Sequence, residues 1–227
     1  MALGEKYNLK KDGERGKYVY CIIKAQEEQK SFGNIGFQGT DVYTIPFKEF
    51  SPVVSDVLFK NYDVENETDI TIHSYVINEV MKAHSVIPVA YGMAFKNKKL
   101  IDISMRSGHK AIKKAIKIVD NKVELGVKVI LPKNGNMYGQ EKEQCKSECT
   151  ERLKQVSFDS KNLSLFSERL IINVSFLVEK DKIQAFSDEV ELLRATYDSF
   201  KFQYSGPWSP YNFVDIHILS KNRRGFR

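Results

Sequence analysis

Apolar and polar positions along the chain follow two different spacings. Short runs rich in β-branched and aromatic residues predict strands, whereas apolar residues that recur every three or four positions predict amphipathic helices. The expected strands cover residues 17–24, 41–46, 51–58, 86–95, 123–131, 169–179, 200–204 and 213–219. The expected helices cover residues 69–83, 98–120, 140–156 and 181–197.

Several polar residues and one proline refine the ends of these elements. Asp69 precedes the apolar series at positions 72, 76, 80 and 83, so we expect it to cap that helix. Asp181 is followed three residues later by Gln184, as in a capping box. Pro88 has no backbone N–H to donate, which predicts an edge strand or the start of a strand.

The order of the expected elements predicts the fold class. A strand, an amphipathic helix and a closing strand follow one another in residues 86–131 and again in residues 169–204. This repeated order predicts an α+β protein with two domains, each a mainly antiparallel sheet with helices on one face, ferredoxin-like or a variant of it.

A segment rich in turn-forming residues, 132–139, is the expected boundary between the two domains, because it combines one proline with two glycines and two asparagines. The expected organisation is a polar leader, an N-terminal domain, a linker, a C-terminal domain and a basic tail. These parts cover residues 1–16, 17–131, 132–139, 140–220 and 221–227.

Composition places the chain among ordinary globular proteins. Its 227 residues are 42% hydrophobic and 28% charged, and the formal net charge of +6 permits acidic partners without requiring them. The sequence contains no apolar run of about eighteen residues, so no membrane span is expected. The polar first segment does not resemble a secretory signal, and three cysteines form no disulfide framework, so we expect a cytoplasmic location.

No arrangement of residue types identifies a catalytic, cofactor or metal site. Glycines 33, 36 and 39 precede an expected strand, whereas a phosphate cradle needs a helix N-terminus. Cys145 and Cys149 lack a second Cys or His pair for zinc and share the apolar face of their helix, so we expect both in the core. The four histidines, which follow no metal or triad spacing, are His73, His84, His109 and His217. We therefore expect no enzyme activity and no cofactor.

The expected helix at 98–120 has a cationic face that offers an alternative function. Ile112 and Ile116 lie opposite the basic residues of segment 106–117, which are Arg106, His109, Lys110, Lys113, Lys114 and Lys117. Such a face can contact nucleic-acid phosphates, although it lacks the aromatic residues of a stacking platform. The same pattern also describes a solvated helix surface.

Residues 206–213, with the sequence G-P-W-S-P-Y-N-F, hold the only tryptophan of the chain between two prolines. Each proline restricts its own φ and favours an extended conformation in the residue before it. A stiff arm that presents large rings is costly to leave exposed. We therefore expect it to dock either between the two domains of the protein or on a partner.

This arm and several other segments resemble the gas vesicle protein F/L family (GvpF/GvpL). The arm is similar to the family's terminal G-P-W-P-P-Y-S-F signature, and segment 86–95 (VIPVAYGMAF) is similar to its L-P-L-R-F-G strand. His73, with valines at 76 and 80, resembles the H-x-x-V-x-x-x-V helix before that strand. Segments 17–24, 33–56 and 123–129 resemble the opening strand, the glycine turn and the E-x-G-V-K-V strand.

The chain departs from the family pattern at three places. Ala90 replaces a frequent arginine, so any role of that charge does not transfer, and Ser209 replaces one proline of the arm. The region between residues 129 and 169 is shorter than the helical segment that many members carry.

The resemblance implies an accessory protein of gas vesicle formation, without catalysis or a cofactor. Its implied partners are the small, hydrophobic wall protein and other vesicle accessory proteins, not a membrane, and its implied role is chaperone, nucleator or minor vesicle component. Trp208, Tyr211 and Phe213 are the candidate contacts, because aromatic anchors dominate many interfaces. Nucleic-acid binding by the cationic helix is the alternative.

Overall fold

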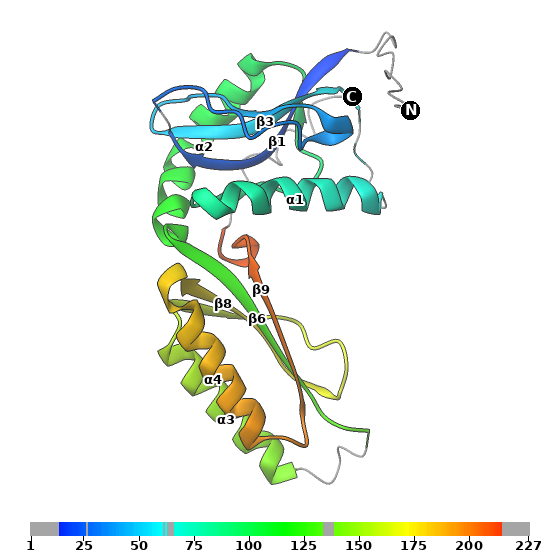
Figure 1. Ribbon diagram of the computed structural model, residues 1–227, viewed down its shortest axis with the longest axis vertical. Coiled ribbons are helices and arrows are strands. Elements are labelled where there is room, and N and C mark those ends of the chain that lie inside the picture. The colour runs from blue at the N-terminus through cyan, green and yellow to red at the C-terminus, as the bar shows by residue number, and fades with distance from the viewer. Residues whose placement is uncertain (1–13, 26, 61, 63–65, 134–138, 215–227) are drawn as a thin grey trace, which may run out of the picture.

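A computed structural model describes residues 14–25, 27–60, 62, 66–133 and 139–214. These residues form two antiparallel β-sheets, each packed against two helices (Figure 1). The expected α+β class with two domains is therefore confirmed. The expected leader and tail lie almost entirely outside the described residues.

The first sheet is built around its longest strand, β1. The order is β2-β3-β1-β4, and β5 also pairs with β1. Pro88 lies in β4 at the edge of this sheet, where a missing N–H costs no ladder bond. The strands are β1 (Arg15–Lys24), β2 (Val42–Thr44), β3 (Phe50–Leu58), β4 (Ile87–Pro88) and β5 (Ala94–Phe95), and a short 3₁₀ turn, η1 (Phe37–Gly39), precedes β2.

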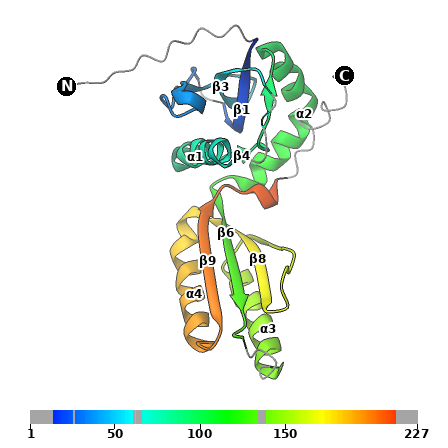
Figure 2. The ribbon, with the colours of Figure 1, turned by 90° about the vertical axis from the view of Figure 1, so that its right-hand side faces the viewer.

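Helices α1 (Glu67–Ala83) and α2 (Lys98–Val119) cover opposite faces of the first sheet (Figure 2). Tyr20 of β1 belongs to the same buried cluster as Val80 of α1. Val19, its neighbour, belongs to a second cluster with Ile112 of α2. The expectation that helices lie on one face is wrong for this sheet. The reason is that β1 is a nearly continuous apolar run, which buries both of its faces.

The second sheet has the ferredoxin-like order β7-β8-β6-β9 and is antiparallel throughout. Alternate residues of β6, such as Leu125 and Val127, pack in one cluster with Leu153 of α3 and Phe186 of α4, so both helices cover one face. The elements are β6 (Lys122–Ile130), α3 (Gly139–Gln155), β7 (Asp159–Asn162), β8 (Leu170–Glu179), α4 (Ile183–Thr196) and β9 (Lys201–Trp208).

The strand expected to close the first domain lies instead in the middle of the second sheet. β6 pairs with β8 on one side and with β9 on the other. The change from one sheet to the other therefore falls before β6, at Asp120 and Asn121, whereas the expected linker 132–139 follows it. A segment rich in turn-forming residues indicates a loop, but it does not show whether that loop separates two domains. Here the loop connects β6 with α3, which both belong to the second domain. Residues 134–138 of it are outside the described part.

Both expected helix caps are wrong. The N-cap of α1 is Asn66, whose side chain accepts a hydrogen bond from the backbone N–H of Asp69 at 3.1 Å. The N-cap of α4 is Lys182, which is the last residue of a 3₁₀ turn, η3 (Lys180–Lys182), and makes no side-chain capping bond. In both cases several polar residues precede the helix, and local spacing does not decide which one occupies the cap.

The C-terminal elements also differ from the expected pattern. β9 extends to Trp208 and thus includes Gly206 and Pro207. A 3₁₀ turn, η4 (Tyr211–Phe213), includes the first residue of the strand expected at 213–219, and residues 215–219 of that expected strand lie outside the described part. Within the described residues, no helix is both long enough and apolar enough to cross a membrane.

Gly206 occupies a position that only glycine fits. Its φ is +120°, and a Cβ there would lie 2.8 Å from the backbone oxygen of Glu124 and 3.0 Å from a methyl group of Leu125. Gly206→Ala should therefore lower the free energy of unfolding by roughly 2–4 kcal/mol, measured by denaturant titration.

Gly139→Ala is the matched control for this prediction. Gly139 begins α3, and an added Cβ would have nothing within 4 Å. Alanine also favours the helix, so this variant should be as stable as the parent protein or slightly more stable. Equal unfolding free energies for the two variants would contradict the assigned backbone geometry at Gly206.

Candidate partner-binding site

The C-terminal arm, residues 206–213, lies where the two domains meet, between α1 and the second sheet (Figure 1). Ser209 and Pro210 are buried. Trp208 and Tyr211 remain 49% and 43% exposed, and Phe213 is half-buried. The arm is therefore anchored through its centre while it presents aromatic surface to the outside.

Asn212 anchors the arm to the second sheet through a buried carboxylate. Its backbone N–H donates to Glu124 Oε2 at 2.9 Å, and its side-chain amide donates to Glu124 Oε1 at 2.5 Å. Ser175 of β8 donates a further hydrogen bond to Glu124 Oε1 at 2.8 Å. Because Glu124 is only 6% exposed, these donors replace the water that its charge would otherwise need.

Tyr211 anchors the arm to the first domain through His73 of α1. His73 Nε2 lies 3.0 Å from the Tyr211 hydroxyl and 3.1 Å from the carbonyl oxygen of Val89. A carbonyl can only accept, so Nε2 carries the proton of the ring. Nδ1 then accepts from the Tyr18 hydroxyl at 3.0 Å, and that hydroxyl accepts from the backbone N–H of Gly92 at 2.8 Å.

Burial holds His73 in its neutral form. The side chain is 2% exposed, and burial lowers its pKa to about 4. A second proton would have to sit on Nδ1, which faces the Tyr18 hydroxyl. Burial also raises the pKa of the Tyr211 phenol, which therefore stays protonated and accepts from His73 Nε2 as a neutral hydroxyl.

A surface hollow of about 370 Å³ lies beside the arm. Lys161 of β7 closes part of it by donating from Nζ to the carbonyl oxygen of Asn212 at 3.1 Å. The hollow is lined by Ile118, Asp159, Ser160, Lys161, Tyr211, Asn212, Phe213 and Val214. Tyr211 and Phe213 thus border an open recess in which side chains of another protein have room.

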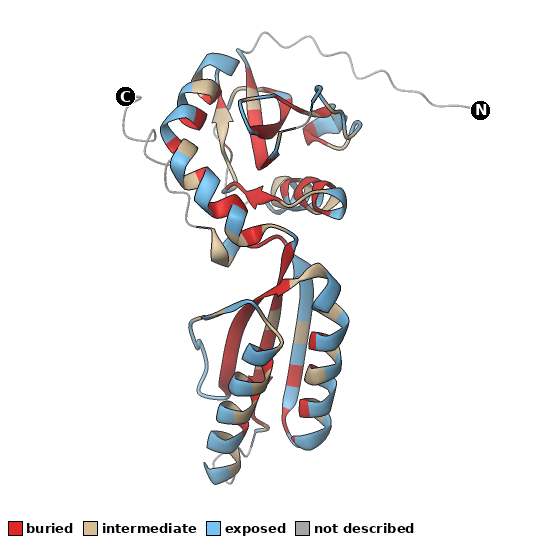
Figure 3. Cartoon of the chain, turned by 90° about the vertical axis from the view of Figure 1, so that its left-hand side faces the viewer, coloured by how far each residue is buried: buried red, intermediate tan, exposed pale blue. Residues whose placement is uncertain are grey.

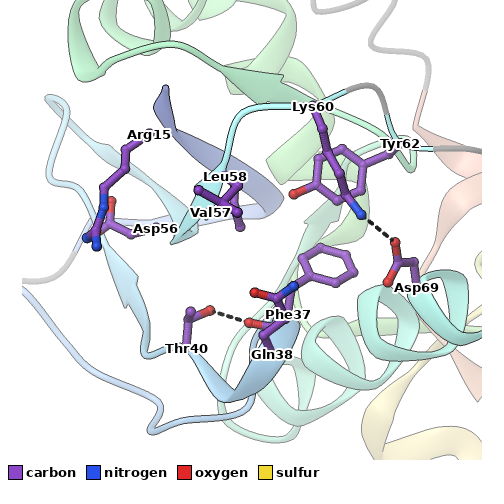
Figure 4. A pocket seen from close by; sticks show the side chains of 10 residues that line it. All are labelled: Arg15, Phe37, Gln38, Thr40, Asp56, Val57, Leu58, Lys60, Tyr62 and Asp69. Carbon is purple, nitrogen blue, oxygen red and sulfur yellow. Dashed lines mark hydrogen bonds and ion pairs between the residues drawn. The ribbon is translucent and has the colours of Figure 1, made fainter. Parts of the chain in front are cut away.

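A smaller pocket, of about 160 Å³, lies on the first domain near the N-terminal end of α1 (Figure 4). Phe37, Val57 and Tyr62 are its buried apolar residues. Lys60 pairs with Asp69 at 3.5 Å and lies over the Tyr62 ring at 5.0 Å. Its lining contains neither a histidine nor a cysteine.

The other candidate residues are placed largely as expected. Cys145 and Cys149 are fully buried in α3, which confirms the core assignment. Gly33 and Gly39 have positive φ in the turns around η1 rather than at the N-terminus of an α-helix. Among the residues that the structure describes, no group of three or more His, Cys, Asp or Glu side chains could hold a metal ion.

The partners of the arm were not identified from the sequence. Glu124 gave one usable signal, because a carboxylate within the apolar strand V-E-L-G-V-K-V is expected to need a partner. Nothing local connects it with Asn212, which lies 88 positions further along the chain. His73 drew attention only through the family motif.

Comparison with known proteins gives consistent matches over nearly the whole chain. The family described as gas vesicle synthesis protein GvpL/GvpF matches residues 16–138 and 134–215. Gas vesicle protein F1 of Halobacterium salinarum is 35% identical over 214 residues, which cover 92% of this chain and 98% of that protein. Gas vesicle protein F of Haloferax mediterranei is 33% identical over 213 residues, covering 92% and 97%.

Two crystal structures share the fold. GvpF from an Anabaena species aligns with a TM-score of 0.79 at 18% identity, over 89% of this chain and 97% of that one. GvpF from Microcystis aeruginosa aligns with a TM-score of 0.75 at 15% identity, over 88% and 99%.

The contacts of the arm predict different costs for two neighbouring substitutions. Asn212→Ala removes a donor from the buried Glu124 carboxylate and should lower the free energy of unfolding by roughly 2–4 kcal/mol. Trp208→Ala, at a half-exposed position, should cost only about 1 kcal/mol. Denaturant titration of both variants compares them directly. Equal losses would mean that the Trp208 ring belongs to the core.

His73 predicts a specific dependence of stability on pH. Its pKa is about 4 in the folded protein, below the usual 6.5, so the unfolded chain binds more protons between these values. The contribution of the buried neutral imidazole to the free energy of unfolding amounts to about 3 kcal/mol. It is complete above pH 6.5 and declines as the pH falls towards 4. His73→Gln should flatten this part of the stability profile. An unchanged slope between pH 4 and 6.5 would contradict a buried neutral imidazole.

Proposed function

The chain belongs to the GvpL/GvpF family of gas vesicle synthesis proteins, and we propose on this basis that it is a non-enzymatic accessory protein that binds the small hydrophobic wall protein during vesicle assembly. Membership rests on a family match over residues 16–138 and 134–215 and on the relatives described above. Gas vesicle formation is the process in which the family takes part, and the direct partner is the further step proposed here.

The observation that supports the proposal is the half-exposed aromatic surface of an anchored arm. Asn212 and Tyr211 hold the backbone in place, while the Trp208 ring remains 49% exposed. An anchor that is already ordered loses little conformational entropy when it binds a partner. Buried aromatic rings also contribute a large share of the binding free energy at many interfaces.

The expected partner has the complementary property. A small wall-forming protein with a large apolar face tends to aggregate before it is assembled, because exposed apolar surface associates without specificity. Contact with Trp208 and with the recess bordered by Tyr211 and Phe213 would cover part of that face. A chaperone, a nucleator and a minor vesicle component would each cover this apolar face, so the proposal includes all three roles.

Co-expression with the wall protein tests this proposal. An affinity-tagged copy of the chain should keep the wall protein in the soluble fraction and co-purify with it. Trp208→Ala should reduce the recovered wall protein at least about tenfold, because a central aromatic anchor is lost. The melting temperature of the purified variant should stay close to that of the parent protein.

Leu192→Ala is the matched control, because Leu192 is also a large apolar residue and is 56% exposed, but on α4. This variant should recover as much wall protein as the parent. Loss of all wall protein to the pellet with the parent chain would contradict direct binding. Equal recovery with Trp208→Ala and Leu192→Ala would contradict the role of the arm.

A further inference from the structure

Helix α2 carries the charge excess of the protein. It contains seven basic residues and one acidic residue, an excess that equals the formal net charge of +6 of the whole chain. The opposite face of the helix is apolar and packs on the first sheet. The positive charge is therefore concentrated on the exposed side of α2. Exposed residues, including this side of the helix, are pale blue in Figure 3.

Four of these residues form what we call the basic stripe: Arg106, Lys110, Lys114 and Lys117. All four are exposed, and their spacing of four, four and three positions places them on one side of the helix over about 16 Å. Within the described parts of the chain, no acidic side chain forms an ion pair with any of them; the acidic partners near α2 are engaged by other residues, such as Lys98 and Lys113.

The flank of the stripe already binds one carboxylate from within the chain. Glu49 lies 2.9 Å from His109 Nε2 and 3.5 Å from Lys113 Nζ. The hydrogen bond from His109 contributes most to lowering the pKa of Glu49, which falls to about 2. This side of α2 thus shows how a protein carboxylate is held, while the stripe beside it has no such partner among the described residues.

An exposed apolar residue lies beside the stripe. Ile103 is 45% exposed and precedes Arg106, Lys110 and Lys114 by three, seven and eleven positions, so it lies on the same side of α2. A row of cations that includes an isoleucine fits a partner that offers carboxylates together with an apolar side chain. A phosphate backbone offers only the charges.

Two other anionic partners fit this surface less well. Insertion into a lipid surface needs an accessible apolar face, whereas that face of α2, including Ile101, Ile112 and Ile116, is buried against the first sheet. The phosphates of a nucleic acid would come close to the Glu49 carboxylate beside the stripe, and the two negative charges repel each other. The helix also offers no Phe, Tyr or Trp ring for base stacking.

We propose that the basic stripe and Ile103 together form a second docking surface, whose partner is an acidic amphipathic helix of another protein. Three turns of such a helix match the length of the stripe, with glutamate or aspartate side chains opposite its cations and one apolar side chain over Ile103. This surface shares no residue with the C-terminal arm, although Ile118 at the same end of α2 lines the recess beside the arm. Substitutions in the stripe therefore test it independently of the wall-protein proposal.

The test uses the full chain and a synthetic probe. The probe is a fluorescein-labelled helical peptide of about eighteen residues, with glutamates spaced to face the stripe and one row of leucines, and its binding is followed by fluorescence anisotropy. We expect saturable binding that weakens at least about tenfold between low salt and about 0.5 M salt, because the Debye length shortens.

Substitutions assign the binding to the stripe. Lys110→Glu, Lys114→Glu and Lys117→Glu combined should weaken peptide binding at least about tenfold. A control with the same change in net charge replaces three exposed lysines elsewhere, Lys133, Lys154 and Lys201, by glutamate and should stay within about twofold of the parent. Circular dichroism checks that both variants remain folded.

Ile103→Ser separates a protein partner from other polyanions. It should weaken peptide binding about fivefold and leave the salt dependence unchanged, because only apolar contact is lost. Single-stranded DNA, double-stranded DNA and phosphatidylserine vesicles are titrated in parallel. The proposal is overturned if any of them binds as tightly as the peptide, if the peptide does not bind, or if the stripe and control variants behave alike.

Discussion

A carboxylate buried in a strand must be given hydrogen-bond donors, and the way Glu124 obtains them organises the junction of the two domains. Its donors come from Ser175 on the neighbouring strand and from Asn212 on the arm. Removing one donor would leave a charge in a site that water does not reach, so the position of Asn212 is strongly determined. Tyr211 is the residue before it, and its hydroxyl is thereby brought to His73 of the first domain.

The two domains also share buried apolar surface. One cluster runs from Tyr20 of the first sheet through Val80 of α1 to Val123 of the second sheet. Polar contacts border this cluster, since Lys180 donates to the carbonyl oxygen of Met81 at 2.8 Å. Helix α1 therefore serves both as the cover of the first sheet and as the surface on which the second domain rests.

Local sequence patterns predicted the elements better than their partners. The periodicity that defines α2 or β8 lies within the element itself, so their extents were close to those observed. Membership of β6 in the second sheet depends on pairing with residues some forty to eighty positions later, which composition does not encode. The arm was recognisable because proline and tryptophan are rare, whereas its two anchors, His73 and Glu124, are separated from it by the length of a domain.

The order of synthesis gives the arm one more property. Residues 206–213 leave the ribosome after every described residue that they hold in place, because both His73 and Glu124 precede them. Until then β6 has no neighbour on the side that β9 occupies, and the Glu124 carboxylate has no donor from the arm. The nascent first domain can form its own sheet early, whereas the contacts of Tyr211 and Asn212 with the two domains form only after the arm has been made. Completion of the aromatic surface at the domain junction is thus coupled to completion of the chain segment that presents it.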